Sequence, residues 1–422
     1  MKAVILAAGE GERFQPITMA RPKHLIKVGG KPILEHCLNA LKTAGVEEAV
    51  IVVYHMADAI RQYFGDGKKF GLNIEYVEQK ALFGIGNAPG TIELIMKEDF
   101  VLVNGDMLFS PDPLRKVICL HQKEKAAATM AVVPVDKPDD YWIVELEDEK
   151  RVKHIVKKPN VGVTLSDFAD AGIYVLSTEV FAKLRKIAPT ENGLEIPEAL
   201  SILTSDSNAV LAVKIPSEDR LSIDRPWNVL DANRWVLTRM KSETLGIIEE
   251  GAHLIGPVAL AENACVRSGA YIEGPTFIGE LSEIGPNCYI RPFTSVCKNV
   301  MIGNASEIEN SIVMDGTHIG QFSYVGDSIL GENCDFGAGT ITANYRLDAG
   351  TIKMVVEGEL VDSGRNKLGA ILGDNVRTGI DALFMPGVVV GQGSQIGPNV
   401  VVQRDVMAKS VILLKQEVDK RT

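Results

Sequence analysis

The stretch Ile278-Gly-Glu-Leu-Ser-Glu-Ile284-Gly-Pro-Asn-Cys-Tyr-Ile290 places an isoleucine at every sixth position. A period of six fits neither an α-helix nor an alternating strand. It fits a parallel β-solenoid, in which each aliphatic side chain points inward and stacks on its counterpart in the next turn. Ten aliphatic residues keep the interval without exception: Leu254, Leu260, Val266, Ile272, Ile278, Ile284, Ile290, Val296, Ile302 and Ile308.

The same register returns nearer the C-terminus, after a break. Residues 342–368 interrupt the repeat, and we interpret them as an inserted loop. Such an insertion often has a function, although a plain excursion of the chain is an equal alternative. The predicted β-helix covers residues 250–410, and residues 411–422 form a tail. The returning positions are Leu372, Phe384, Val390, Ile396 and Val402, with Thr378 in place of one aliphatic residue.

Residues 1–226 show a different pattern, in which short apolar strands alternate with helix-like segments. Leu34, Leu38 and Leu41 recur at helical spacing between the first two strands. This alternation predicts an α/β domain with right-handed crossovers, a Rossmann-like, mostly parallel sheet, and ligands at its carboxyl edge. Residues 227–249 are predicted to form a linker helix. The strand candidates are residues 4–8, 49–54, 74–77, 100–103 and 130–135.

The first predicted strand opens into a glycine loop that contains two cations. The loop reads Ala8-Gly9-Glu-Gly11-Glu-Arg13, and Arg21-Pro-Lys23 follows. Glycine permits backbone angles that let main-chain N–H groups close on phosphate oxygens. The spacing is neither the P-loop pattern nor the dinucleotide pattern, since no third glycine and no Gly-Lys-Ser/Thr follows. The loop therefore predicts a site for a nucleoside triphosphate, with Arg13 and Lys23 supplying positive charge.

One carboxylate follows a buried strand at the edge where the triphosphate is expected. Asp106 ends the run Val101-Leu-Val-Asn-Gly-Asp106. A hard carboxylate at this edge can hold Mg²⁺, which would neutralise charge on the bound triphosphate.

Composition limits the classes of partner. The 422 residues have a net charge of −11 and a pI near 5.3, which argues against nucleic acid or an anionic membrane as a partner. The six cysteines form no C-x-x-C pair, as expected for a reducing compartment. The apolar run at residues 3–8 is too short for a signal peptide or a membrane span. We therefore expect a cytoplasmic protein.

The motif G-x-G-x-R, with Pro-Lys ten residues beyond the arginine, resembles the signature of sugar-1-phosphate nucleotidylyltransferases. These include the archaeal and bacterial bifunctional enzymes that make UDP-N-acetylglucosamine. The resemblance implies that Arg13 stabilises pyrophosphate and that Lys23 lies near the reacting phosphates. It places the second metal ligand at Asn228, beside Asp106. It also implies that Ala8, Gly9, Gly11, Gln79 and Gly84 bind the nucleotide, with Gln79 reading a pyrimidine base.

The sugar half departs from the family pattern. Trp142 stands where the family has a glycine whose backbone approaches the sugar. Lys157 replaces a glutamate that accepts hydrogen bonds from sugar hydroxyls, and Asp170 replaces an asparagine. Ile85 also departs from the small residue expected after Gly84. Together these changes predict a different sugar, a repositioned sugar or a weakened enzyme.

The solenoid resembles the left-handed hexapeptide β-helix of acyltransferases, which implies a homotrimer and acetyl-CoA as a possible cosubstrate. Gln321 stands where the family has the histidine that acts as general base, and an amide cannot replace it at neutral pH. Glu309 stands where the family prefers lysine. We therefore predict that acetyl transfer is absent or strongly reduced. Four positions keep the family residue type: Arg291, Tyr324, Asn344 and Lys353.

The sequence thus predicts a Mg²⁺-dependent nucleotidylyltransferase that uses UTP or dTTP and a sugar 1-phosphate. Three alternatives remain open. The chain could be a fully bifunctional enzyme that also acetylates glucosamine 1-phosphate. It could be a glucose-1-phosphate thymidylyltransferase, because Gln79 reads an edge that UTP and dTTP share. It could also be a non-catalytic regulatory homologue, although such proteins usually lose the metal or phosphate ligands that this chain keeps.

Overall fold

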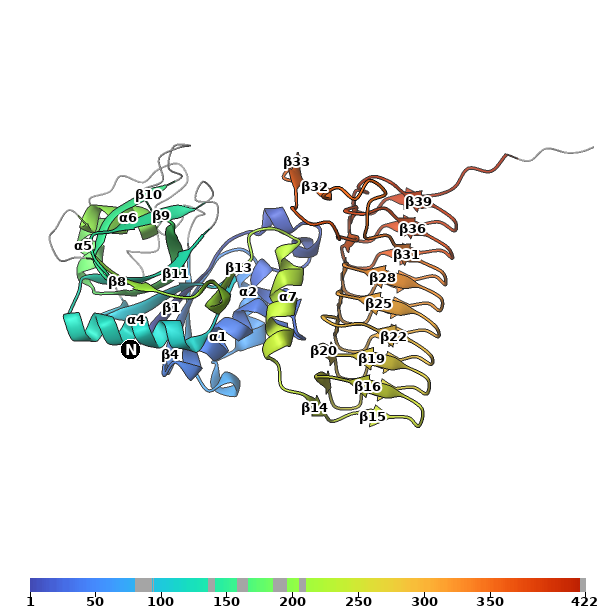
Figure 1. The fold of residues 1–422 in the computed structure, drawn as a ribbon, viewed down its shortest axis with the longest axis horizontal. Coiled ribbons are helices and arrows are strands. Elements are labelled where there is room, and N and C mark those ends of the chain that lie inside the picture. Colours follow the sequence, from blue (N-terminus) through green and yellow to red (C-terminus); the bar gives the residue numbers. More distant parts are fainter. Residues whose placement is uncertain are drawn as a thin grey trace, which may run out of the picture. The chain divides into compact units, whose positions relative to one another are not determined.

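The computed structural model describes residues 1–79, 93, 95–135, 141–157, 166–184, 196–204 and 210–417, which form two compact units (Figure 1). The first unit comprises Met1–Glu10 and Ile33–Ser222, and the second comprises Gly11–Pro32 and Ile223–Thr422. The glycine loop from Gly11 onward therefore groups with the C-terminal half of the chain, although it follows the first strand in sequence.

The first unit is built around a mixed sheet with the strand order β10-β9-β11-β6-β1-β4-β5. Its centre is parallel and matches the strands predicted from the sequence: β1 (Ala3–Ala7), β4 (Glu48–Val53), β5 (Asn73–Glu78) and β6 (Phe100–Asn104). The predicted strand at residues 130–135 is also confirmed, as β8 (Ala128–Pro134). The sequence did not predict the remaining strands, β9 (Trp142–Leu146), β10 (Val152–Lys157), β11 (Phe168–Leu176) and β12 (Val210–Lys214).

Helices accompany this sheet as the alternating pattern predicted. The leucine spacing is confirmed by α1 (Ile33–Thr43), on which Leu34, Leu38 and Leu41 are fully buried. The strand β7 (Met107–Phe109) pairs with β13 (Arg220–Ser222) in a small separate sheet. The other helices are α2 (Ala57–Phe64), α4 (Pro111–Glu124), α5 (Glu179–Leu184) and α6 (Ile196–Leu203).

The second unit contains a parallel β-helix made of three sheets, which we call the first, second and third solenoid sheets. The first contains β14 (Glu243–Thr244), β17 (Val258–Leu260), β20 (Thr276–Ile278), β23 (Ser295–Val296), β26 (Ile312–Val313), β29 (Ile329–Leu330), β34 (Ile371–Leu372) and β37 (Val389–Val390). The second contains β15 (Ile247–Ile248), β18 (Cys265–Val266), β21 (Glu283–Ile284), β24 (Met301–Ile302), β27 (His318–Ile319), β30 (Asp335–Phe336), β35 (Arg377–Thr378), β38 (Gln395–Ile396) and β40 (Val411–Ile412). The third contains β16 (His253–Ile255), β19 (Tyr271–Glu273), β22 (Tyr289–Ile290), β25 (Glu307–Glu309), β28 (Tyr324–Gly326), β31 (Ile341–Thr342), β36 (Leu383–Phe384) and β39 (Val401–Val402).

The six-residue repeat forms the core of this β-helix, as predicted. Nine of the ten predicted aliphatic positions are buried in one continuous cluster, and Leu254 packs against its end. Each aliphatic side chain stacks on the residue one coil away, as in the pairing of Ile290 with Ile308. The solenoid ends slightly later than position 410, because β40 pairs with β38.

The apparent break in the repeat has a structural explanation at one corner of the solenoid. Where the chain passes from the third sheet to the first, two coils are one residue short, from Ile308 to Val313 and from Val325 to Leu330. The next passage at this corner contains the insertion between β31 and β34, which includes the hairpin β32 (Lys353–Val356) and β33 (Glu359–Asp362). The shortened coils shift the register of the sequence, but the core continues through them.

Two further segments pack on the outward side of the first solenoid sheet. One is α7 (Asn228–Arg239), within the segment predicted as a linker helix, and the other is Gly11–Pro32, which ends in β2 (Lys27–Val28) and β3 (Lys31–Pro32). Gly30 lies so close to the Phe277 ring that a Cβ atom there would be 2.1 Å from a ring carbon. Glycine is therefore required at this contact.

Candidate functional site

The carboxyl edge of the first unit brings together several of the predicted site residues. The strands β1 and β6 are neighbours, and the N–H of Gly105 donates to the carbonyl of Leu6 at 2.9 Å. Ala8 and Gly9 leave the end of β1 beside the position where Asp106 leaves β6. The chain runs from β1 to β4 on one side while β6 lies on the other, so this is the switch point at which open α/β sheets bind ligands.

Gln79 lies at the same edge, directly after β5. Its N–H donates to the carbonyl of Val53 at 2.9 Å, and the residue is 8% exposed. The Asp106 carboxylate contributes to the electrostatics of this unit, since burial and then this charge raise the pKa of the Cys37 thiol. Gly84 and Ile85 lie outside the described residues.

Three of the residues that depart from the family pattern form one row across β10, β9 and β11. Lys157 is the direct cross-strand partner of Trp142, and its ammonium lies 5.4 Å from the centroid of a Trp142 ring. The pairing of Ala169 with Ile143 places Asp170 next to Trp142 in the register. Asp170 accepts hydrogen bonds from the N–H of Gly172 at 3.1 Å and from the Tyr174 hydroxyl. The replacements at positions 142 and 157 thus occur as a contacting pair.

The glycine loop folds back on itself within the second unit. Gly11 has a φ of 71°, and its carbonyl accepts a hydrogen bond from the Thr18 hydroxyl at 2.8 Å. A Cβ atom at Gly11 would lie 3.0 Å from Thr18 Cγ2 and 3.1 Å from Lys23 Cβ. Both the left-handed backbone and the close approach of Lys23 therefore favour glycine at this position.

The two cations of this loop have different surroundings. Lys23 is 7% exposed, and its ammonium lies 4.4 Å from the centroid of the Phe14 ring. Arg13 is about half exposed, and its Nε donates to Glu357 Oε2 at 3.2 Å. Glu357 lies in the turn between β32 and β33, so the inserted hairpin contacts the arginine that was predicted to bind pyrophosphate.

Asn228, the second predicted metal ligand, begins α7. Its Oδ1 accepts the N–H of Arg225 at 2.9 Å, and its Nδ2 donates to Asp231 Oδ2 at 3.2 Å. The other oxygen of Asp231 accepts from Arg365 of the insertion at 2.6 Å. Sequence reasoning missed Asp231, although its position three residues after Asn228 on a helix places both on one face.

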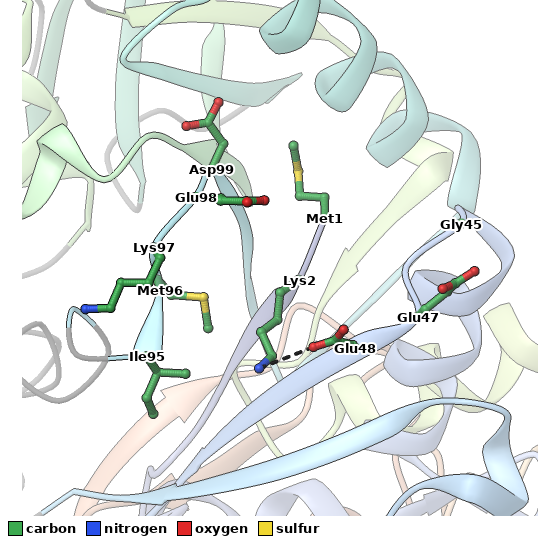
Figure 2. Close-up of a pocket in the computed structure, with 10 residues that line it drawn as sticks. All are labelled: Met1, Lys2, Gly45, Glu47, Glu48, Ile95, Met96, Lys97, Glu98 and Asp99. Atoms are coloured by element: carbon green, nitrogen blue, oxygen red, sulfur yellow. Dashed lines mark ion pairs between the residues drawn. The ribbon is translucent and has the colours of Figure 1, made fainter.

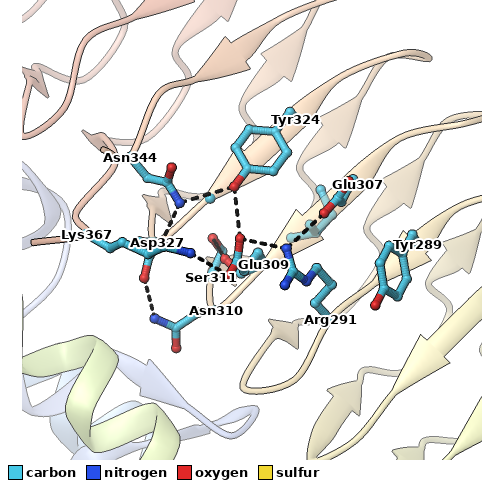
Figure 3. A network of polar contacts seen from close by, with 12 residues as sticks. Tyr289, Arg291, Glu307, Glu309, Asn310, Ser311, Tyr324, Asp327, Asn344 and Lys367 are labelled. Atoms are coloured by element: carbon cyan, nitrogen blue, oxygen red, sulfur yellow. Dashed lines mark hydrogen bonds and ion pairs between the residues drawn. The ribbon is translucent and has the colours of Figure 1, made fainter. Parts of the chain in front are cut away.

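The acyltransferase-like residues form a polar network on the third solenoid sheet and at the shortened corner (Figure 3). Glu309 is at its centre, with Oε2 accepting from the Arg291 guanidinium and the Tyr324 hydroxyl, both at 3.0 Å. Its Oε1 accepts from Lys367 at 3.1 Å. Burial alone would raise the pKa of Glu309, but the hydrogen bonds from Lys367 and Tyr324, together with the positive charges, lower it. Glu309 is therefore an ionised carboxylate held by two cations.

The rest of the network extends along the same corner. Asn344 Nδ2 donates to the Tyr324 hydroxyl at 3.1 Å and to Asp327 Oδ2 at 2.6 Å, and Asn310 donates to the other oxygen of Asp327 at 2.6 Å. Burial and the contact with Glu309 raise the pKa of the Tyr324 hydroxyl, so it stays protonated. Sequence reasoning missed Asp327 and Lys367, which become neighbours of these residues only through the stacking of coils.

The other acyltransferase-like residues lie apart from this network. Gln321 is exposed between β27 and β28, and Lys353 lies on β32 opposite Asp362. His318 faces outward on the second solenoid sheet and contacts Asp335 at 3.1 Å. It therefore lies on a different face of the solenoid from Tyr324, which is on the third solenoid sheet.

A pocket of about 520 Å³ lies at the opposite edge of the first unit's sheet from Asp106 (Figure 2). Its lining includes Lys2, Glu48 and Asp99, at the amino ends of β1, β4 and β6. The ammonium of Lys2 lies 3.4 Å from Glu48. Because nucleotides bind open α/β sheets at the carboxyl edge, this pocket is not the reaction site.

The described residues contain neither a metal cluster nor a membrane-spanning helix. They contain no group of three or more His, Cys, Asp or Glu side chains arranged to hold a metal ion. Over the same parts of the chain, no helix is long and apolar enough to cross a membrane.

A Rossmann-like sheet with a glycine loop after its first strand, followed by a hexapeptide solenoid, defines the class of nucleotidyltransferases fused to a left-handed β-helix. Comparison with known proteins agrees, since the nucleotidyl transferase family model matches residues 2–228. The model for the GMPPB C-terminal domain matches residues 272–384, and the bacterial transferase hexapeptide model matches residues 369–404. The chain belongs to the sugar-1-phosphate nucleotidyltransferase family.

Relatives of the same two-part organisation extend over almost the whole chain. The chain is 39% identical to the bifunctional protein GlmU of Methanococcus maripaludis, over 99% of this chain and 98% of the relative. It is 38% identical to a bifunctional sugar-1-phosphate nucleotidylyltransferase/acetyltransferase of Sulfurisphaera tokodaii, over 96% of this chain and 98% of the relative. A Bacillus anthracis structure described as a glucose-1-phosphate thymidylyltransferase is 27% identical, with a TM-score of 0.50, and the match covers 55% of this chain and 94% of that one.

Proposed function

We propose that this protein transfers a nucleotidyl group from UTP or dTTP to a sugar 1-phosphate and releases pyrophosphate. The observation that supports this most is the fold of the glycine loop. In this fold Gly11 packs directly against the Cβ atom of Lys23, which is buried. In this reaction the sugar phosphate oxygen attacks the α-phosphorus of the triphosphate. No protein nucleophile is needed, so catalysis depends on positioning and charge neutralisation.

Each residue has a proposed role in that step. Lys23 lies near the reacting phosphates, and Arg13 stabilises the pyrophosphate that leaves. The backbone around Ala8, Gly9 and Gly11 binds phosphate oxygens, because N–H groups in such a turn form an anion-binding concavity. Gln79, supported by its position at the carboxyl edge, reads the pyrimidine base, with Gly84 nearby in sequence.

Asp106 and Asn228 are the proposed Mg²⁺ ligands. A carboxylate and an amide oxygen are hard donors that suit Mg²⁺, and an amide oxygen has a second lone pair when one accepts a hydrogen bond. In Asn228 one lone pair of the amide oxygen accepts the backbone N–H of Arg225, and this hydrogen bond fixes the orientation of the amide. When bound, the metal would neutralise charge on the phosphates.

The sugar is proposed to differ from N-acetylglucosamine. The pair Trp142 and Lys157 adds bulk and positive charge where the family has a glycine and a glutamate, and Asp170 lies beside it. A release assay for pyrophosphate, run over a matrix of nucleoside triphosphates and sugar 1-phosphates, tests both substrates at once. Ordinary turnover of N-acetylglucosamine 1-phosphate would contradict the altered sugar site.

The test of the nucleotidyl site uses Lys23→Ala and Asp106→Asn. With the best substrate pair, each substitution should lower kcat/KM for pyrophosphate release by about 100-fold or more, because each removes a charge aimed at the transition state. Lys31→Ala, at an exposed lysine of the same segment, is the matched control and should keep wild-type rates. An unchanged rate in Lys23→Ala would refute the assignment.

We further propose that the solenoid does not transfer acetyl groups from acetyl-CoA. The Glu309 carboxylate already accepts hydrogen bonds from Arg291 and Lys367, the cations that would otherwise attract an anionic ligand. Gln321 has no basic nitrogen that could act as a general base. Thiol release from acetyl-CoA with glucosamine 1-phosphate should stay at background. A normal rate would establish the bifunctional alternative instead.

We also propose that the protein is a cytoplasmic homotrimer. The hexapeptide repeat supports a homotrimer through the solenoid, which sedimentation of the full chain would measure. The six cysteines are all free thiols, as expected in the reducing cytoplasm.

A further inference from the structure

The glycine loop is attached to the solenoid by a buried arginine that no proposed catalytic role explains. Arg21 is 8% exposed. Its Nη2 donates to Asp374 Oδ2 at 2.6 Å and lies 3.2 Å from Glu332 Oε2, while its Nη1 lies 2.9 Å from Met314 Sδ. One guanidinium thus contacts three side chains of the solenoid.

The two carboxylates that bind Arg21, Asp374 and Glu332, are also in contact with each other's residue. Asp374 is 6% exposed, and its second oxygen accepts the N–H of Glu332 at 2.8 Å. Burial raises the pKa of Glu332, so this carboxylate relies on the nearby arginine to remain charged. Removing one partner from such a buried cluster leaves an uncompensated charge, which is far more costly than losing an exposed ion pair.

A second ion pair attaches Gly11–Pro32 to the solenoid, a few residues after Arg21. Lys27 forms an ion pair with Asp315, whose other oxygen accepts the N–H of Lys298 at 3.0 Å. Pro16 approaches the solenoid at Gly373, where a Cβ atom would lie 3.0 Å from the proline Cβ. The segment is therefore held at three points.

Lys23 lies between the two ionic contacts, two residues after Arg21 and four before Lys27. The intervening chain is a tight 3₁₀ turn, in which the N–H of Leu25 donates to Pro22 and that of Ile26 donates to Lys23. With both ends tied and so few residues between them, the backbone of Lys23 has little freedom to move independently. The position of the Lys23 side chain then follows from where the solenoid carboxylates hold Arg21.

We infer that the solenoid positions the segment Gly11–Pro32, and that Arg21 is a positioning residue for nucleotidyl transfer which acts through Lys23. This inference rests on the proposed function. It gives the solenoid a role in the reaction that needs no acyl transfer, because Asp374, Glu332 and Asp315 would fix the geometry of a loop that supplies the catalytic charge.

The test uses Arg21→Lys and Asp374→Asn in the full chain. Arg21→Lys keeps the charge but not the forked geometry. Since a displacement of about 1 Å can cost 100-fold in rate, kcat for pyrophosphate release should fall by about 10-fold or more in each variant. KM for the triphosphate should change less than kcat. Arg267→Lys is the matched control, because Arg267 also binds two solenoid carboxylates, Glu249 at 2.7 Å and Glu283 at 2.8 Å.

A double-mutant cycle separates positioning from general damage. In a Lys23→Ala background, Arg21→Lys should cause little further loss of the residual activity, because the group it positions is absent. Independent losses that multiply would overturn the inference. Hydrogen exchange supplies a readout besides activity, since amides of Gly11–Pro32 should exchange faster in Asp374→Asn while those of the solenoid coils around Ile284 stay protected.

The outcomes are distinguishable from failure of the proposed function. An active wild type with an unchanged kcat in Arg21→Lys, or with unchanged exchange of Gly11–Pro32 in Asp374→Asn, overturns the inference alone. A wild type that releases no pyrophosphate with any substrate pair overturns the proposed function and the inference with it. If Arg21→Lys does not fold, Asp374→Asn and Glu332→Gln decide the question, because both keep the shape of the carboxylates they replace.

Discussion

At the scale of single residues, Glu309 shows how one side chain can change the chemistry of a site. A carboxylate in place of the family's lysine reverses the charge between Arg291 and Lys367, and both cations bind it directly. Only 14% of its side chain is exposed. The result is a cluster in which carboxylates of the protein itself bind both cations.

Restoring the lysine should therefore destabilise the solenoid. Glu309→Lys would place a third cation among the other two, and we expect the free energy of unfolding in urea to fall by about 1–3 kcal/mol. Glu307→Lys is the control, since Glu307 makes a more exposed ion pair with Arg291 at 3.2 Å, and its loss should cost about 1 kcal/mol or less. Equal stability of Glu309→Lys and the wild type would contradict this view of the cluster.

At the scale of elements, α7 holds the end of the glycine loop to the solenoid through one buried asparagine. Asn233 is fully buried and its Oδ1 accepts from the N–H of Gly29 at 2.8 Å and from the Ser295 hydroxyl at 2.6 Å. Its Nδ2 donates to the carbonyl of Phe293 at 2.8 Å. A single amide therefore satisfies three polar groups from two other segments of the second unit.

Asn233→Leu should keep most of the volume of this side chain but leave those groups without a partner. At about 1–3 kcal/mol for each unsatisfied buried group, we expect a loss of about 2–5 kcal/mol in the free energy of unfolding. Thr238→Ala, on the exposed side of the same helix, should change it by less than about 0.5 kcal/mol. A thermal or urea melt of both variants checks the contrast.

The elements that the sequence predicted are those with strong local patterns. The parallel strands, α1 and the hexapeptide core follow from apolar periodicity, and the structure confirms them. The strands β9 and β10 were missed because antiparallel strands with an exposed face show a weaker signal. The two shortened coils were missed because the loss of one residue in a coil moves every later position out of a fixed period of six.

The sequence predicted the site residues that directly follow an apolar strand. It did not predict the contacts that depend on the stacking of solenoid coils. Asp106 and Gln79 could be placed because each directly follows an apolar strand. The contact of Arg21 with Asp374 joins positions 353 apart, and the contact of Lys27 with Asp315 joins positions 288 apart. No local pattern encodes such pairings, since they depend on the number of residues in every intervening coil.

At the scale of the whole molecule, a buried histidine makes the first unit sensitive to acid. His121 on α4 is fully buried, with Nδ1 3.1 Å from the Thr129 hydroxyl and Nε2 3.2 Å from Asp99. Burial lowers the pKa of His121, although Asp99 opposes this effect. The folded state therefore binds a proton at this site less readily than the unfolded chain.

Stability should accordingly fall as the pH drops below about 6.5, the pKa of an unperturbed histidine, until the lower folded pKa is reached. The neutral His121 side chain therefore contributes to the free energy of unfolding above about pH 6.5, and this contribution is lost as the pH falls. Urea unfolding between pH 5 and 7.5 should show a smaller slope in His121→Gln than in the wild type. His154→Gln, at an exposed histidine of the same unit, is the control and should leave the slope as it was.

The attachment of Gly11–Pro32 to the solenoid also has a consequence for the synthesis of the protein. The loop leaves the ribosome long before Asp315, Glu332 and Asp374, because its contacts with Asp315 and Asp374 join positions that are 288 and 353 residues apart. A product that terminates early would contain Lys23 without the groups that anchor its loop. Since domains begin to fold as they are synthesised, the first sheet can form well before its nucleotide loop becomes ordered. The loop is thus made before the solenoid but reaches its final structure after it, and only a chain that extends through the solenoid has the loop fixed in place.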